Sequence, residues 1–534
     1  MAKELHFDKD ARQKLLAGIR PVAKLVGSTM GPRGLCAVIE RQVTDQSGHV
    51  QKLQPVISKD GITCARAIVL SDPTENMGAD LIKEAGSRSL AEAGDGTSAS
   101  IVLCHSIFSY GLKALDEGFS SIWLRSGIEK AVARVVELIS RMSIPVGDRI
   151  FQVANIAANG DKEIATTVTE ALKLAGPNGI VSVDQSRSDK THIDFSSGMS
   201  FDSGLRYQDF CSDAARGECV LENPYLLLHE QRLQSITQID KILKGVVEQH
   251  RPILFISEEF ELPIVGLLLA NLAVLKSCCV VSPWFGERRK DFLKDLAVFT
   301  GGVAVTTELG LELKNSDITI LGQCEKAVIT KGSTTLIGGK FKEQEMKDRI
   351  STLKHVIATS ENAYEKEVCA ERLAKLDGGV AVIKIGAATQ SECKEKQDRC
   401  EDSVLSVKSS QEEGIVPGGG IALLRASENR QFLDWIETLS PEEKRGAEIV
   451  KDALEAPIRQ ILANGGYQDE VLHNVQGKEQ NYGFDAMNGV YCDMLDAGIV
   501  DASRVVKQAL INASSLAGTL LTCSGTVVNL PENK

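Results

Sequence analysis

The segment AGDGTSAS, at residues 93–100, has residue types and a spacing that could bind a nucleotide phosphate. It joins two segments with helical apolar spacing, so its glycines would precede a helix N-terminus with unpaired backbone N–H groups. Asp95 would repel a bare phosphate, and its presence fits a Mg²⁺ ion that bridges phosphate oxygens. An ordinary turn between helices, with Thr97 as a cap, explains the same residues and is favoured for this motif alone.

Three further segments combine glycine with polar side chains. They are TMGPRG at 29–34, SKDG at 58–61 and PGGG at 417–420. Glycine allows a close approach of the backbone to a ligand, while Thr29, Lys59 and Asp60 supply a hydroxyl, a cation and a carboxylate. For each segment alone, a simple turn or a hinge is the competing explanation. Asp402 lies in the helical stretch CKEKQDRCEDSVLSV, where a solvated charged face would ordinarily explain its carboxylate.

The elements that must position these residues fall into three parts. Helical spacing of apolar residues dominates from about 8 to 142, and it returns beyond about 412 as far as Leu521. The two helical parts predict one discontinuous domain. Within the first part, β-branched runs at 35–58 surround the polar tip TDQSGH and predict a hairpin.

The middle part predicts a small α/β domain, because short apolar runs alternate there with helical segments. The runs are PILFIS at 252–257, CCVVS at 278–282 and VAVTT at 303–307, and the helices are expected at 261–276 and 287–299. Three flanking segments are expected to connect the parts and to share strands across a long sequence gap. They are MSIPVG at 142–147, IVSVDQ at 180–185 and VAVIKIGAAT at 380–389.

Composition restricts the function classes. The chain has 60 Lys and Arg against 72 Asp and Glu, and this net charge of −12 makes nucleic acid a poor partner. The longest apolar run, IVGLLLANLAVL at 264–275, is too short for a membrane span. The N-terminus has no apolar signal-peptide core, and the 13 cysteines contain no C-x-x-C pair. We therefore expect a cytoplasmic protein with free thiols and no membrane contact.

The motifs gain weight from their order along the chain. They are TMGPRG, SKDG, NMGAD with AGDGT, FGERRK at 285–290, GGVAVIKIGAAT at 378–389, EEGIVPGGGIALL at 412–424 and EAPIRQILANGG at 455–466. In this order they resemble the group I chaperonins, the bacterial GroEL-like family, collinearly from about Phe7 to Pro531. Several departures from the family pattern, described below, suggest a divergent paralogue.

The resemblance implies a multidomain fold that combines α and α/β parts. A helical equatorial ATPase domain would comprise 1–141 and 413–534, and a small intermediate hinge domain would comprise 142–196 and 381–412. An α/β apical domain at 197–380 would bind substrate. Such a subunit would bind and encapsulate unfolded proteins in a ring, seven-membered and single or double, together with a small lid co-chaperonin. Its cofactors would be ATP, Mg²⁺ and K⁺.

The resemblance also implies roles for individual residues. The nucleotide would be held by Thr29, Met30, Gly31, Pro32, Lys59, Asp95, Gly96, Thr97, Ser98, Ala99, Gly419, Asp485, Ala486, Met487, Ile499 and Asp501. Asp95 would coordinate Mg²⁺, and Lys59 would lie near the phosphates and K⁺. Asp402 would orient or deprotonate the attacking water, helped by Asp60, after a hinge motion brings it to the nucleotide. The substrate surface would contain Leu205, Phe210, Leu233, Ile236, Leu243, Val265, Leu269, Ala270 and Asn271.

The departures concern both sites. Met30, Ala99 and the run Asp485–Ala486–Met487 replace the usual residues around the nucleotide, and the loss of one hydroxyl costs about 0.5–1.5 kcal/mol. In the apical groove, Asp209 and Asp240 place carboxylates among apolar residues, which disfavours purely apolar peptides. The sequence ends in NLPENK where the family usually has a flexible Gly-Gly-Met tail, and segment 41–56 is longer and more polar than usual.

Two functions therefore stay open. One is an ATP-cycling folding chaperonin. The other is a non-cycling holdase or partner-binding protein with weak or no ATPase activity. An unrelated metabolic enzyme has little support, because the sequence shows no constellation of nucleophile and base and no metal-ligand cluster.

Overall fold

The computed structural model describes residues 3–44, 50–176, 179–186, 188–212, 217–360 and 362–529. The chain forms two compact units. The first comprises Met1–Thr169, Val183–His192 and Ile385–Lys534, and the second comprises Glu170–Ser182 and Ile193–Lys384. Helix α7 (Lys162–Ala175) and strands β4 (Ile180–Gln185), β5 (His192–Phe201) and β14 (Gly379–Ile385) cross the boundaries between the units. The finer division into three domains stays a prediction.

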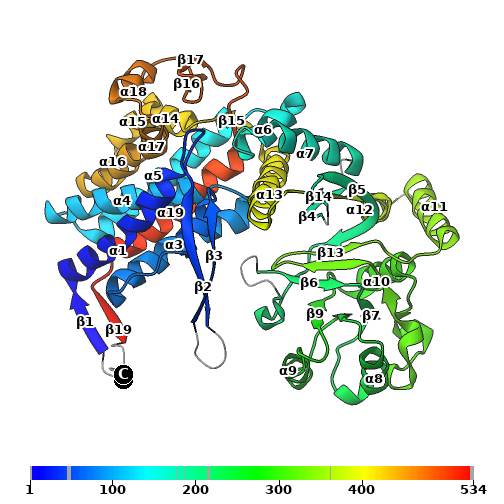
Figure 1. Cartoon of the computed structure of the whole chain (residues 1–534). Coiled ribbons are helices and arrows are strands. Elements are labelled where there is room, and N and C mark those ends of the chain that lie inside the picture. Colours follow the sequence, from blue (N-terminus) through cyan, green and yellow to red (C-terminus); the bar gives the residue numbers. More distant parts are fainter. Residues whose placement is uncertain are drawn as a thin grey trace. The chain divides into compact units, whose positions relative to one another are not determined.

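The first unit is mainly helical. Its helices are α1 (Asp8–Ser28), α2 (Gly61–Arg66), α3 (Pro73–Ala93), α4 (Thr97–Asp116), α5 (Ser121–Met142), η1 (Gly147–Arg149), α6 (Ile150–Ala157), α13 (Gln390–Glu413), α14 (Ile421–Glu428), α15 (Arg430–Ile436), α16 (Pro441–Ala453), α17 (Ala456–Asn464), α18 (Asp469–Val475) and α19 (Ser503–Leu521). Helices α1, α3, α4, α5, α16 and α19 pack side by side (Figure 1). Their shared core joins Leu15 and Phe108 from the start of the chain to Leu510 from its end. The predicted discontinuous helical body is confirmed.

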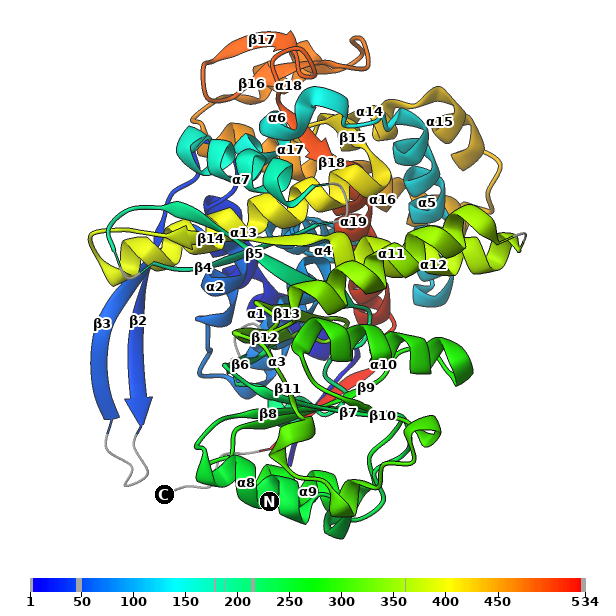
Figure 2. The ribbon, with the colours of Figure 1, turned by 90° about the vertical axis from the view of Figure 1, so that its right-hand side faces the viewer.

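In the part of the first unit that the structure describes, four antiparallel strand pairs accompany the helices. They are β1 (Lys3–Phe7) with β19 (Gly525–Asn529), β2 (Ala37–Thr44) with β3 (Val50–Ser58), β15 (Ile415–Pro417) with β18 (Val500–Ala502), and β16 (Tyr482–Asp485) with β17 (Val490–Asp493). The β2–β3 pair is the predicted hairpin, and its strands extend together away from the helices of the unit (Figure 2). Most of the predicted tip TDQSGH, at 45–49, and residues 530–534 of NLPENK lie outside the described residues.

The second unit has α/β architecture. Its elements, besides those at the boundaries, are η2 (Gln208–Phe210), β6 (Cys219–Glu222), β7 (Tyr225–His229), η3 (Ile236–Gln238), α8 (Asp240–Glu248), β8 (Ile253–Ser257), α9 (Leu262–Ala270), β9 (Ser277–Val281), α10 (Gly286–Thr300), β10 (Ala304–Val305), η4 (Thr307–Leu309), η5 (Leu313–Asn315), η6 (Ile318–Ile320), β11 (Gly322–Gln323), β12 (Lys326–Ile329), β13 (Thr334–Ile337), α11 (Glu343–Thr359) and α12 (Ala363–Asp377). The apolar runs predicted as strands are β8, β9 and β10. The predicted α/β domain is therefore confirmed.

Two sheets form the centre of the second unit. In one, β10, β7, β8 and β9 are parallel neighbours and β11 joins β7 in the antiparallel direction. In this unit, α10 covers one face of the parallel sheet, and α8 and α9 lie on the other (Figure 2). The second sheet has the order β4-β14-β5-β13-β12-β6, so the segments at 180–185 and 380–389 become neighbouring strands, as expected.

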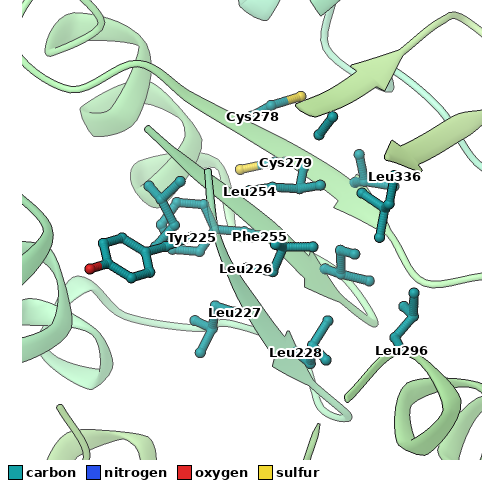
Figure 3. Close-up of a cluster of buried hydrophobic side chains, with 14 of the residues drawn as sticks. Tyr225, Leu226, Leu227, Leu228, Leu254, Phe255, Cys278, Cys279, Leu296 and Leu336 are labelled. Carbon is teal, nitrogen blue, oxygen red and sulfur yellow. The ribbon is translucent and has the colours of Figure 1, made fainter. Parts of the chain in front are cut away.

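The core of this unit combines aliphatic side chains with phenylalanines and buried thiols. Figure 3 shows Leu226, Leu228, Leu254 and Phe255 from adjacent strands gathered with Cys279. All thirteen cysteines of the chain are free thiols, as the sequence predicted. Within the described ranges, each helix is either too short or too polar to cross a lipid bilayer.

Two helices differ from the prediction. The helix expected at 261–276 ends at Ala270, because Asn271 closes it and its side-chain amide donates to the Leu267 carbonyl at 2.7 Å. The helical spacing of Leu233, Ile236, Ile239 and Leu243 predicts one helix, but α8 begins only at Asp240, after a capping box at η3.

Candidate functional site

The turn between α3 and α4 builds the centre of the candidate site in the first unit. Gly94 closes α3 at φ 79° and Gly96 precedes α4 at φ 89°, a left-handed region that other residues rarely adopt. No side chain caps α4, so the first-turn N–H groups of Thr97, Ser98 and Ala99 keep their capacity to bind an anion. The Thr97 hydroxyl is buried and donates to the Gly86 carbonyl at 3.4 Å. This turn therefore offers backbone groups to a ligand.

Asp95 lies in this turn and is held by two hydrogen bonds. Its Oδ1 accepts from the Gly96 N–H, and its Oδ2 accepts from the Ser406 hydroxyl at 3.3 Å. Burial raises the pKa of Asp95, and the charge of Asp60 raises it further. The side chain still reaches solvent in part. It can therefore meet a ligand cation.

Helix α13 brings Asp402 to the same place. Burial raises the pKa of Asp402 well above its usual range, and the charges of Asp95 and Asp60 act in the same direction. Three α13 hydroxyls fix the helix beside the turn. Ser406 binds Asp95, Ser409 donates to the Ala93 carbonyl at 2.6 Å, and Ser403 donates to the Ala154 carbonyl at 3.0 Å. Asp402 and Ser406 are one helical turn apart, so both side chains can lie on the face towards Asp95.

Asp60 has a structural role that the sequence prediction missed. It caps α2, and its carboxylate accepts from the N–H groups of Ile62 and Thr63 at 3.3 and 2.9 Å. The Thr63 hydroxyl also donates to it at 2.6 Å. Its charge nevertheless acts on Asp95 and Asp402, as their raised pKa values reflect.

The segments around Lys59 and Thr29 lie close together. The Lys59 ammonium donates to the Gly31 carbonyl at 3.0 Å, and burial lowers the pKa of Lys59. Gly61 leaves room for Ser98, because a Cβ atom at Gly61 would lie 2.4 Å from the Ser98 hydroxyl oxygen. The Thr29 hydroxyl donates to the Val26 carbonyl and is buried, so it is already paired inside the protein.

Strand β18 adds a fourth carboxylate, Asp501. Burial raises its pKa to about 7, the charge of Asp95 contributes, and a hydrogen bond from the Gly419 N–H opposes the shift. The register of β15 and β18 places Val416 opposite Asp501, and the Gly418 N–H donates to the Ile499 carbonyl at 2.9 Å. The glycine run therefore lies against the strand that carries Asp501.

The run Asp485–Ala486–Met487 forms the turn of the β16–β17 hairpin, an element that the sequence reading missed. The Asp485 carboxylate accepts from the N–H groups of Met487 and Asn488 at 2.8 and 3.1 Å, and from the Asn488 amide at 2.6 Å. Met487 is exposed, and its carbonyl accepts from Arg33 at 2.8 Å. The Asp-Ala-Met-Asn-Gly run at 485–489 is itself a turn signal, and aromatic residues flank it on both sides.

The structure thus brings the expected nucleotide residues together in one unit. Met30 and Pro32 lie in the same loop as Gly31, and the Met30 carbonyl accepts from Asn464 at 2.8 Å. Among the described residues no three His, Cys, Asp or Glu side chains are placed to hold a metal ion by themselves. Asp95 with water and phosphate oxygens is a donor set that suits Mg²⁺, which retains several waters and binds through one or two carboxylates.

The expected substrate residues divide by burial in the second unit. Leu205, Phe210, Leu233 and Val265 are buried in its core, and so they do not form surface in this structure. Ile236, Leu243 and Leu269 are half-buried, while Ala270 and Asn271 are exposed. Three apolar side chains missed by the sequence reading are exposed instead: Leu262 at 72 %, Leu267 at 41 % and Val274 at 71 %. Helix α9 is apolar on nearly all sides, so its sequence does not indicate which of its faces is exposed.

The two carboxylates noted in this region are both exposed. Asp240 pairs with Lys244 one helical turn later, at 2.7 Å, so part of its charge is balanced locally. Asp209 lies in the short helix η2, next to buried Phe210.

Comparison with known proteins agrees with this architecture. The family model described as "TCP-1/cpn60 chaperonin family" matches residues 22–531. Two crystal forms of the chaperonin gp146 from the bacteriophage EL 2 (Pseudomonas aeruginosa), solved in the presence of ATP-BeFx, are 21 % identical to the chain and cover 99 % of both chains. Their TM-scores are 0.66 and 0.60, which shows a shared fold. The chain belongs to the TCP-1/cpn60 chaperonin family.

Proposed function

We propose that this chaperonin binds and hydrolyses ATP in its first unit and uses the reaction to assist protein folding. The placement of Asp402 carries the proposal. Helix α13 holds this carboxylate near Asp95, beside the uncapped N-terminus of α4. A half-buried carboxylate with a raised pKa is suited to accept a proton from an attacking water.

The residues around the turn between α3 and α4 would each bind a different part of the nucleotide or its cations. The α4 N-terminus and its dipole would bind the phosphates through Thr97, Ser98 and Ala99. Asp95 would hold Mg²⁺, which when bound neutralises phosphate charge. Lys59, fixed by the Gly31 carbonyl, would place its charge at the phosphate end of the site and beside K⁺. Gly96 would let the backbone approach the phosphates closely.

The remaining expected ligands would form the base and ribose end. Gly419, Asp501 and Ile499 lie together through the β15–β18 pair, and Met30, Pro32 and the turn at Asp485–Met487 would close the other side. The ATP-BeFx present in the gp146 crystals supports a nucleotide site in this fold. The nucleotide site is further supported by the mutual repulsion of four carboxylates, which a bound cation would relieve. They are Asp60, Asp95, Asp402 and Asp501.

The second unit would bind unfolded clients on the α8–α9 side. Exposed Leu262, Leu267 and Val274 supply apolar surface of the kind that binds unfolded segments. We propose that subunits assemble into a ring, seven-membered and single or double, that encloses the client under a small lid co-chaperonin in the cytoplasm. Group I membership and these assembly details rest on the motif resemblance.

A non-cycling holdase is the second candidate. It is favoured by exposed Asp209 and Asp240 and by burial of four of the nine side chains expected on the client surface. A surface with fewer apolar groups and added carboxylates would bind lid and client differently.

Steady-state ATP hydrolysis by the purified protein, with Mg²⁺ and K⁺, separates the two candidates. Turnover that needs K⁺ and is lost in Asp402→Ala supports the cycling chaperonin. Equal inactivity of the wild type and Asp402→Ala would contradict it and favour the holdase. Asp434→Ala, at an exposed carboxylate on α15, is a control that should retain most activity.

A further inference from the structure

Two amide side chains on α6 have buried oxygens that find no hydrogen-bond partner among the residues that the structure describes. They are Gln152 Oε1 and Asn155 Oδ1, which belong to a small set of such atoms among the described residues. The two residues are three apart on one helix, so their side chains lie on the same face. A buried carbonyl oxygen without a donor costs about 1–3 kcal/mol. This cost suggests that the oxygens serve a ligand.

The amides lie beside the candidate nucleotide site, in the same unit. Gln152 packs on Gly498, because a Cβ atom at Gly498 would lie 2.8 Å from Gln152 Cγ. Gly498 directly precedes Ile499, and α6 packs against β18, which carries Asp501. The amides are thus next to the strand expected at the base and ribose end.

Helix α6 is also fixed to the helix that carries Asp402. The Ser403 hydroxyl on α13 donates to the carbonyl of Ala154, the residue that precedes Asn155. Helix α6 packs against α13, so the amide pair and Asp402 lie on neighbouring helices. A group that binds the amides would therefore also bias the seating of Asp402.

We infer that the side-chain amides of Gln152 and Asn155 form hydrogen bonds with the nucleobase and make the site selective for adenine. This inference rests on the proposed ATP binding and adds a specificity determinant to it. An amide side chain matches the edge of adenine, where the exocyclic N6 amine donates and N7 accepts. Hypoxanthine and guanine carry an oxygen at that position, which would face the unpartnered amide oxygens and be rejected.

Asp485, which the motif resemblance places at the base and ribose end of the site, is less suited to recognise the base. Asp485 already accepts three hydrogen bonds within its own turn. Its carboxylate is therefore a constituent of the hairpin and has little freedom to turn towards a base. Among the described residues, by contrast, the side-chain oxygens of Gln152 and Asn155 accept no hydrogen bond.

The test compares binding of ATP and inosine triphosphate, which differ at the N6 amine and have the same phosphates. Dissociation constants are measured by calorimetry on the wild-type chain and on Gln152→Met and Asn155→Leu. We expect the wild type to prefer ATP by about tenfold or more, and each variant to lose most of that preference through weaker ATP binding. Gln431→Met, at an exposed glutamine of α15, is the matched control and should keep the preference.

The binding constants decide whether the α6 amides determine the selectivity for adenine. If the wild type binds both nucleotides equally, or if either variant keeps its preference for ATP, the inference is wrong and nucleotide binding stands. If neither nucleotide binds the wild type, the proposed function fails as well. Circular dichroism and melting curves confirm that each variant is folded. A variant that only melts earlier, with its preference unchanged, shows that the amides bind a structural water and also overturns the inference.

Discussion

Replacing Asp501 with asparagine should stabilise the nucleotide-free protein, most strongly at alkaline pH. The pKa of Asp501 is raised from an ordinary value of 3.8 to about 7, first by burial and then by the charge of Asp95. Between these two values the folded chain binds more protons than the unfolded chain. Stability contributed by this group therefore falls as the pH rises from about 4 to 7.

The magnitude follows from the shift. Three pKa units at about 1.4 kcal/mol each give at most about 4 kcal/mol of destabilisation by ionised Asp501 at pH 8. At pH 5, the same relation between pKa and stability gives a destabilisation by Asp501 of about 2 kcal/mol or less. Asp501→Asn removes the charge, keeps the shape and can still accept from the Gly419 N–H. Its advantage over the wild type should therefore grow with pH.

The assay is thermal unfolding of both chains without nucleotide, in a chelating buffer, at pH 5 and pH 8. We expect Asp501→Asn to raise the apparent Tm by several degrees at pH 8 and by clearly less at pH 5. Asp434→Asn, at an exposed carboxylate on α15, should change neither value. A gain that is equal at both pH values, or absent at pH 8, would refute the account of a buried, repelled carboxylate.

Substitutions at four other positions test the remaining assignments. Asp402→Asn should leave ATP binding intact and reduce single-turnover hydrolysis by about 100-fold or more, because a general base contributes that much; equal rates would remove Asp402 from catalysis. Asp60→Ala should lower the free energy of unfolding by about 1 kcal/mol by uncapping α2, whereas Asp60→Asn should keep the cap, as melting curves of both would show. In the second unit, Leu267→Glu should weaken client binding, measured by suppression of aggregation, without lowering Tm. Leu233→Ala should instead cost about 2–4 kcal/mol of stability through a core cavity.

The sequence predicted the architecture well, because the spacing of apolar residues and the position of turn residues are local features of the chain. The helix-to-helix turn at Gly94–Gly96, the β2–β3 hairpin and the parallel strands all follow from apolar spacing and turn residues. The discontinuous core was also predictable, since both chain ends carry the same helical pattern. The hairpin β16–β17 was missed because its strands have four residues each, too few for a period to emerge.

Burial was harder to predict than element type. The α9 segment LPIVGLLLA is apolar on almost every side, so its sequence could not distinguish buried Val265 from exposed Leu267. Only packing of the helix on its sheet decides which side faces the core. The structural role of Asp60 was hidden for a related reason, because an N-cap aspartate and a catalytic aspartate look alike in a sequence.

The position of α13 results from two opposing terms. Ser403, Ser406 and Ser409 each contribute a hydrogen bond, and the two that reach backbone carbonyls, from Ser403 and Ser409, are worth about 1 kcal/mol each. Against them, the seated helix brings Asp402 close to Asp95 and Asp60, and the raised pKa values show that this proximity opposes ionisation. A cation at Asp95 removes most of that repulsion and leaves the hydroxyl contacts intact. Cation and nucleotide binding would therefore shift the helix towards its seated position, and loss of phosphate and cation after hydrolysis would reverse the shift. Under the proposed function, this balance would couple the occupancy of the site to the position of Asp402 without any further contact.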